Sequence, residues 1–102
     1  MTTVAEFLRE KVSNMARWLE DNGLKTTLPQ FQDVHIVALA QALRDKYAQA
    51  IDTCDFTPIM EDKENVPSEV LKVIEHVRAR PDLQDKFWRY LKLFSETVSV
   101  HE

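Results

Sequence analysis

Residues 81–98 read PDLQDKFWRYLKLFSETV and hold four aromatic side chains within eight positions. At 100° per residue, a helix over 82–98 gathers its larger apolar residues into one stripe, which comprises Leu83, Phe87, Leu91, Phe94 and Val98. The charged residues Asp85, Arg89, Lys92 and Glu96 fall on the opposite side. This stretch therefore predicts a helix that buries one face in a helical domain.

Two large apolar residues of this helix lie outside the stripe. Trp88 lies about 100° to one side of it and Leu93 about 120° to the other. Either they contact neighbouring helices of the same bundle, or they form a second surface, since Trp is frequent among the residues that dominate binding energy. We therefore take Trp88 and Leu93, with the charged Arg89 and Lys92 beside them, as candidate partner-binding residues.

Helical periodicity also predicts helices over 3–22, 29–53 and 68–79. Thr3-Val4-Ala5-Glu6 has the spacing of a capping box, and Gly23 suits the left-handed position after a helix end. Thr27-Leu28-Pro29-Gln30 fits a second capping box, although Asp33 is a competing start for the helix over 29–53. The fold class expected is all-α, a compact bundle of about four helices forming one domain over residues 1–102.

The helix expected over 29–53 is apolar on two sides. Val34, Ala38 and Ala42 lie opposite its main apolar face, which runs through Ile36, Leu39, Leu43, Tyr47, Ala50 and Ile51. A helix of this kind is central in its domain or is shared with another chain. We therefore add Val34, Ala38 and Ala42 to the candidate partner-binding residues and expect a homodimer through the 29–53 or the 82–98 helix.

The net charge of −4 arises in one connector. Residues 45–64 hold six acidic and two basic residues, whereas the rest of the chain balances at eleven of each. Pro58 and Pro67 break the helical pattern here, and we expect a connector in which Phe56, Ile59 and Met60 pack back onto the core. The acidic excess disfavours a nucleic acid or an anionic membrane surface as partner.

Composition sets further expectations. Hydrophobic residues make up 44% and charged residues 29%, as in folded globular chains. A single glycine leaves little for phosphate-binding loops, and a single cysteine, Cys54, permits no internal disulfide. With no signal peptide and no membrane-spanning apolar run, we expect a cytoplasmic protein.

The sequence offers no pattern typical of a reaction centre. His35, His76 and His101 lack a second ligand at helical spacing, so no metal is expected, and no cofactor motif occurs. We assign no catalytic residue and expect a protein without enzymatic activity. Lys11 lies inside the apolar stripe of the first helix, where it either extends its ammonium to water or pairs with a carboxylate or a ligand.

These patterns favour a small regulatory or adaptor protein, of the inhibitor or anti-activator type, that binds another protein through exposed apolar helix faces. The first alternative is a DNA-binding regulator that uses the 68–79 and 82–98 helices as a helix-turn-helix, although Asp82 and Asp85 would then face phosphates. The second alternative is a small-ligand binder with a pocket near Lys11.

Overall fold

The computed structural model describes residues 3–101, and every regular element among them is helical. The elements are, in chain order, α1 (Val4–Asp21), η1 (Leu28–Gln30), α2 (Asp33–Asp45), α3 (Ala48–Thr53), α4 (Thr57–Glu61), η2 (Lys63–Asn65), α5 (Ser68–Arg78) and α6 (Pro81–His101). The prefix η marks a short 3₁₀ helix. The all-α prediction is confirmed, with six α-helices where we expected about four.

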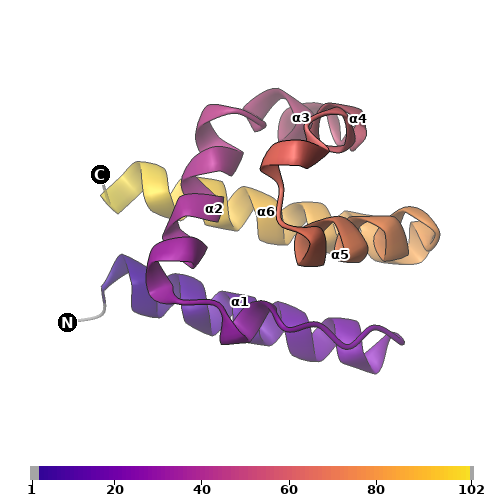
Figure 1. Ribbon diagram of the computed structural model, residues 1–102, viewed down its shortest axis with the longest axis horizontal. Coiled ribbons are helices and arrows are strands. Elements are labelled where there is room, and N and C mark those ends of the chain that lie inside the picture. Colours follow the sequence, from indigo (N-terminus) through magenta and orange to yellow (C-terminus); the bar gives the residue numbers. More distant parts are fainter. Residues whose placement is uncertain (1–2, 102) are drawn as a thin grey trace.

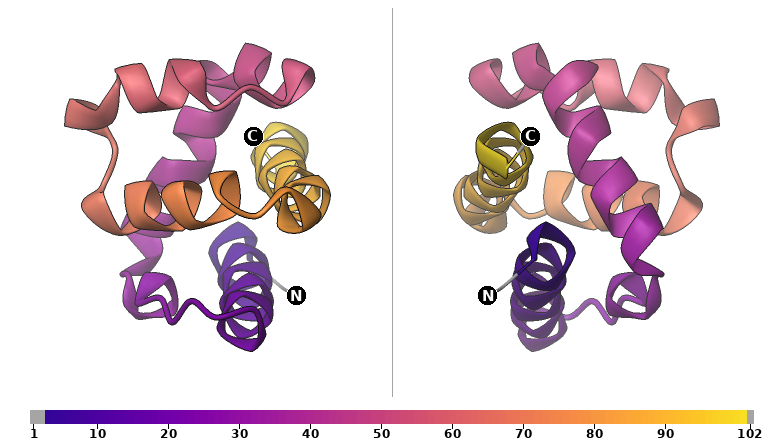
Figure 2. Two further views of the ribbon diagram at one scale, coloured as in Figure 1. Left: turned by 90° about the vertical axis from the view of Figure 1, so that its right-hand side faces the viewer. Right: turned by 90° about the vertical axis from the view of Figure 1, so that its left-hand side faces the viewer.

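The two longest helices, α1 and α6, run antiparallel beside each other (Figure 1). Helix α2 crosses this pair and contacts both of its members, and α5 packs against α6. Seen along the pair, α2 and α5 lie on the same side of it (Figure 2). The short helices α3 and α4 close one end of the molecule above α6 (Figure 1).

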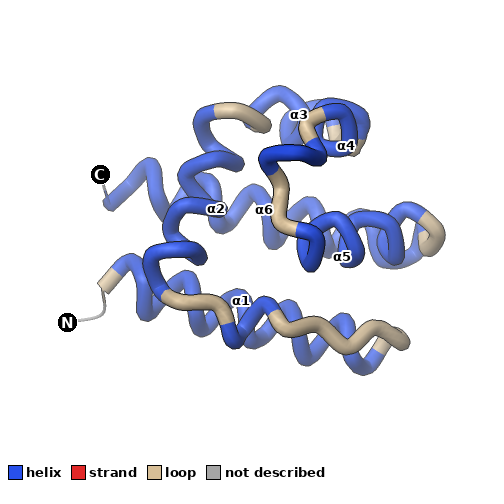
Figure 3. The backbone as a smooth tube through the Cα atoms, viewed as in Figure 1, coloured by secondary structure: helices blue, strands red, loops and turns tan. Residues whose placement is uncertain are grey.

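Helix α1 has the ends that its sequence predicts. The Thr3 hydroxyl accepts a hydrogen bond from the Glu6 amide at 3.1 Å, which satisfies one of the free donors of the first turn. Gly23 adopts φ +97 just after the helix, and the Leu24 amide bonds back to the Leu19 carbonyl at 2.9 Å. The loop that follows runs back along α1 before the chain enters α2 (Figure 3).

The prediction of one helix over 29–53 is wrong. Pro29 lies in the 3₁₀ turn η1, Phe31 is extended, and α2 begins at Asp33. The predicted Thr27 cap does not form, because the Thr27 side chain makes no capping bond. A second break comes at Tyr47, whose buried side chain bonds to Asp62 and so fixes a turn between α2 and α3.

The connector after α3 is more regular than we predicted, since it forms α4 and η2. The Asp55 carboxylate accepts a hydrogen bond from the Thr57 amide at 3.0 Å and so supports the first turn of α4. Phe56 and Ile59 are buried and Met60 packs partly against the core, as expected. The connector therefore forms a wall of the fold.

The stripe predicted on the last helix is confirmed as core. Its members Leu83, Phe87, Leu91, Phe94 and Val98 are all buried. They share one core with buried side chains of the other α-helices, including Leu8 and Leu19 of α1 and Val73, Ile74 and Val77 of α5. Helices α1, α2, α3 and α5 all contact α6, which is thus the central element of the fold.

Candidate functional site

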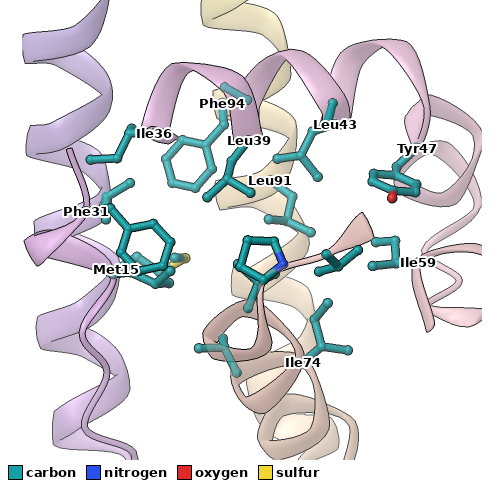
Figure 4. A pocket seen from close by; sticks show the side chains of 18 of the residues that line it. Met15, Phe31, Ile36, Leu39, Leu43, Tyr47, Ile59, Ile74, Leu91 and Phe94 are labelled. Atoms are coloured by element: carbon teal, nitrogen blue, oxygen red, sulfur yellow. The ribbon is translucent and has the colours of Figure 1, made fainter. Parts of the chain in front are cut away.

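An apolar pocket of about 90 Å³ lies between α2 and α5, and α1 and α6 form its floor (Figure 4). Its walls include Leu8, Val12 and Met15 of α1, Ile36, Leu39, Ala40, Ala42 and Leu43 of α2, Val70, Val73 and Ile74 of α5, and Phe87, Leu91 and Phe94 of α6. Leu28, Phe31, Tyr47, Ile59 and residues 65–67 complete the lining. The pocket therefore joins segments that are far apart in sequence.

The exposure of the lining residues locates the mouth of this pocket. Leu39 and Leu43 of α2 are half-buried, as are Val66, Pro67 and Val70 on the facing side. The residues deeper in the lining, among them Val73 and Phe87 of the core, are buried. Leu39 and Leu43 point from α2 across the pocket toward Ile59 and Ile74 (Figure 4). The pocket thus opens to solvent between α2 and the start of α5.

Two lining residues carry a side-chain nitrogen or oxygen, and both bond to the same carboxylate. The Tyr47 hydroxyl donates to Asp62 Oδ2 at 2.5 Å, and the Asn65 amide donates to Asp62 Oδ1 at 2.7 Å. These bonds leave the space itself with apolar walls. The pocket can therefore select a guest by apolar surface and shape, not by hydrogen bonds or charge.

This hydrogen-bonded group shifts the pKa of both partners. Burial, aided by the hydrogen bond to Asp62, raises the pKa of Tyr47 to about 12. The hydrogen bonds from Tyr47 and Asn65 lower the pKa of Asp62 below its usual range. At neutral pH the phenol stays protonated and the carboxylate stays charged, so the connector is held to the end of α2.

Arg9 fixes the side of the pocket formed by the α1–α2 loop. Its guanidinium donates to the carbonyl oxygens of Pro29 at 2.7 Å and Phe31 at 2.6 Å, and it pairs with the Asp33 carboxylate at 2.5 Å. These bonds hold the loop against α1, so that Leu28 and Phe31 line the pocket. Sequence reasoning missed Arg9, because its carbonyl partners lie 20 and 22 positions further along the chain and only the fold brings them together.

Glu69 holds the same loop from the other side. Its carboxylate accepts hydrogen bonds from the Thr26 hydroxyl at 2.9 Å and the Thr27 amide at 3.0 Å. These bonds, the backbone one first, lower the pKa of Glu69 below its usual range. This role could not be predicted from the sequence, because an acidic residue in the first turn of a helix such as α5 is already favoured by the helix dipole.

Trp88 is not the exposed apolar residue that a partner-binding role at the surface requires. Its side chain is 6% exposed and stacks on Phe56 with ring centroids 4.4 Å apart. The prediction that Trp88 adds to the surplus apolar surface is therefore wrong. The alternative interpretation, contact with a neighbouring segment of the same bundle, is the one that the structure shows.

The predicted residues of α2 are not equivalent. Val34 is 65% exposed and Ala38 is exposed, so both lie on the outer face of the helix. Ala42 is half-buried and lines the pocket near its mouth. The three residues thus form a stripe that begins on the outer surface and ends at the pocket.

The remaining predicted residues lie away from this pocket. Leu93 is half-buried and, with Arg89, lines a shallow depression on α6, whereas Lys92 is exposed on another side of that helix. Lys11 is half-buried, with its Nζ 5.1 Å from the centre of the Phe7 ring, and does not line the apolar pocket.

The arrangement of α5 and α6 gives the helix-turn-helix alternative no support. Asp82 and Asp85 are exposed in the first turns of α6, where a recognition helix meets DNA. Arg80 pairs with Asp82 at 2.9 Å and Arg89 pairs with Asp85 at 2.9 Å, so nearby cations are already engaged by carboxylates. The carboxylates of Asp82 and Asp85 would repel the phosphate groups that such a helix end has to approach.

Metal-ligand groups, membrane-spanning helices and similar proteins would each be further evidence of function. Among residues 3–101, no three His, Cys, Asp or Glu side chains come together as metal ligands. Within the same part of the chain, none of the helices combines the length and apolar character that crossing a membrane requires. No protein-family model, curated protein or solved structure matches the chain.

Proposed function

We propose that this protein is a small non-enzymatic interaction module, a regulator or adaptor of the inhibitor type, that accepts one apolar side chain of a partner protein in the pocket between α2 and α5. The observation that carries the proposal is an apolar pocket of about 90 Å³ that opens at the surface. Binding energy at protein interfaces concentrates in a few side chains that fill such pockets.

The size of the pocket supports a side chain over a whole small ligand. Pockets for drug-sized ligands measure roughly 300–1,000 Å³, and an engineered cavity of about 150 Å³ holds benzene. A space of about 90 Å³ is smaller than both and suits part of one apolar residue. The pocket residues also supply no acid, base or nucleophile aimed at the space, which supports a binding role over catalysis.

A selection from a random peptide library tests the proposal. We expect the wild-type protein to enrich peptides with one large aliphatic or aromatic residue. Ala42→Leu places extra carbon atoms at the mouth of the pocket and should weaken those peptides by tenfold or more, about 1.4 kcal/mol. Ala79→Leu, at an exposed position just after α5, is the matched control and should leave affinity unchanged. Peptides that bind Ala42→Leu as tightly as the wild type would contradict the proposal.

The homodimer stays a prediction of its own. The outer stripe of α2, with Val34 and Ala38 exposed, supports it because small residues let two helices approach closely. Sedimentation equilibrium should show a dimer that Ala38→Glu dissociates, since the substitution puts like charges across the two-fold axis. A monomer at every concentration tested would contradict the dimer and leave the pocket proposal unaffected.

A further inference from the structure

No other described helix covers the outer side of the α1–α6 pair (Figure 2). Helical spacing places a row of aromatic and aliphatic side chains beside the buried stripes of these two helices. Phe7 and Trp18 of α1 and Tyr90 and Leu93 of α6 are all half-buried. The Trp18 and Tyr90 rings meet with centroids 5.8 Å apart and so join the two helices. From Phe7 to Trp18 the row follows α1 for about 16 Å, at 1.5 Å per residue.

Two lysines lie against the aromatic rings of this row. Lys86 Nζ lies 5.4 Å from the centre of the Trp18 ring, and Lys11 Nζ lies 5.1 Å from the centre of the Phe7 ring. Lys86 and Arg89 line a shallow depression on α6 with Tyr90 and Leu93, and no carboxylate is among its lining residues. Two acidic residues adjoin these lysines in sequence: Asp85 is exposed and paired with Arg89 at 2.9 Å, and Glu10 is exposed beside Lys11.

We propose that this face, which we call the α1–α6 row, binds an acidic amphipathic helix of a partner protein. The apolar side of such a helix would cover Phe7, Trp18, Tyr90 and Leu93, and its flanking carboxylates would meet Lys11 and Lys86. About three turns of helix match the length of the row.

Charge selects this occupant over others. A basic helix would place its own cations against Lys11 and Lys86. A second copy of this chain, paired face to face about a two-fold axis, would bring each lysine of the row toward the lysines of the other copy. None of the four residues of the α1–α6 row lines the pocket described above, so this inference does not depend on that pocket.

A pair of designed peptides tests the inference on the full chain. The first is an amphipathic helix with apolar residues at i, i+3, i+4 and i+7 and Glu on both flanks, and the second replaces each Glu by Lys. We expect the acidic peptide to shift the fluorescence of Trp18 with saturation. The Trp18→Phe variant, which retains only the buried Trp88, should lose that signal. The basic peptide should give no saturable change.

Charge-reversal variants test whether Lys11 and Lys86 contribute to the binding of the acidic peptide. The double variant Lys11→Glu/Lys86→Glu should weaken the acidic peptide by about tenfold or more. Lys25→Glu/Lys72→Glu makes the same change in net charge at exposed positions outside the row and should change affinity less than about twofold. Lys86→Glu alone, at an exposed position, provides the test if the double variant melts early in circular dichroism.

Three results would overturn the inference. The first is no binding of the acidic peptide at about 1 mM, where even a weak site is half-filled. The second is equal binding of the acidic and basic peptides, which would mean that only apolar contact matters. The third is an equal loss of affinity in the control double variant and in Lys11→Glu/Lys86→Glu, which would reduce the effect to net charge.

Discussion

Replacing Trp88 with Ala should cost the fold about 3–5 kcal/mol of unfolding free energy. The side chain is 6% exposed, stacks on Phe56 at 4.4 Å between centroids, and meets the edge of Phe87 at 6.3 Å. Truncation leaves a cavity the size of an indole between α6 and the connector, and removes two aromatic contacts. The loss is a large part of the roughly 5–15 kcal/mol that stabilises a domain.

Urea denaturation followed by circular dichroism measures this cost. For a chain of 102 residues the unfolding entropy is about 0.2 kcal/mol per kelvin, so a loss of about 4 kcal/mol lowers Tm by about 20 °C. Leu93→Ala is the control on the same helix, because Leu93 is half-buried and should cost about 1 kcal/mol. A loss below about 1.5 kcal/mol for Trp88→Ala, or equal losses for the two variants, would refute the burial of Trp88.

Three further predictions concern the groups that hold the pocket together. Arg9→Met should lower the unfolding free energy by about 1–2 kcal/mol in urea titration, because two carbonyls lose a charged donor whose site is only partly buried. The pKa of Glu69 is lower in the folded protein than its ordinary value of 4.5. The ionised carboxylate therefore stabilises the fold above pH 4.5, and this stabilisation is lost as the pH falls through the pKa of the folded protein. In Glu69→Gln, the unfolding free energy should therefore fall less steeply as the pH is lowered through the acidic range. Since the pKa of Tyr47 is raised from 10.0 to about 12, stability should fall from pH 10 upward, and Tyr47→Phe should reduce that slope.

Capping residues and apolar periodicity predicted the ends of α1 and the buried face of α6 from short stretches of sequence. Thr3 and Gly23 marked the ends of α1, because caps and left-handed positions depend on neighbouring backbone groups. The stripe of α6 was visible because apolar residues recur with the helical period. The division of 29–53 was not visible, since the break at Tyr47 depends on a bond to Asp62, fifteen residues along the chain.

The pocket could be predicted only in part. Helical periodicity places Leu39 and Leu43 on the main apolar face of their helix, and it places Ala42 on the opposite side as a candidate partner-binding residue. The space between them and Val70 depends on how α2 crosses α1 and α6, which no local pattern specifies. The position of Trp88 could not be predicted either. It lies outside the apolar stripe of α6, which suggested an exposed binding residue, but the connector brings Phe56 into a stacked contact with its ring.

The pocket between α2 and α5 is tested most directly by nuclear Overhauser effects between the protein and a peptide selected on it. We predict contacts from the apolar residue of the peptide to the methyl groups of Leu39, Leu43 and Val70, all at the mouth of the pocket. Contacts confined to other surfaces, with these methyl signals unchanged at saturation, would contradict the account.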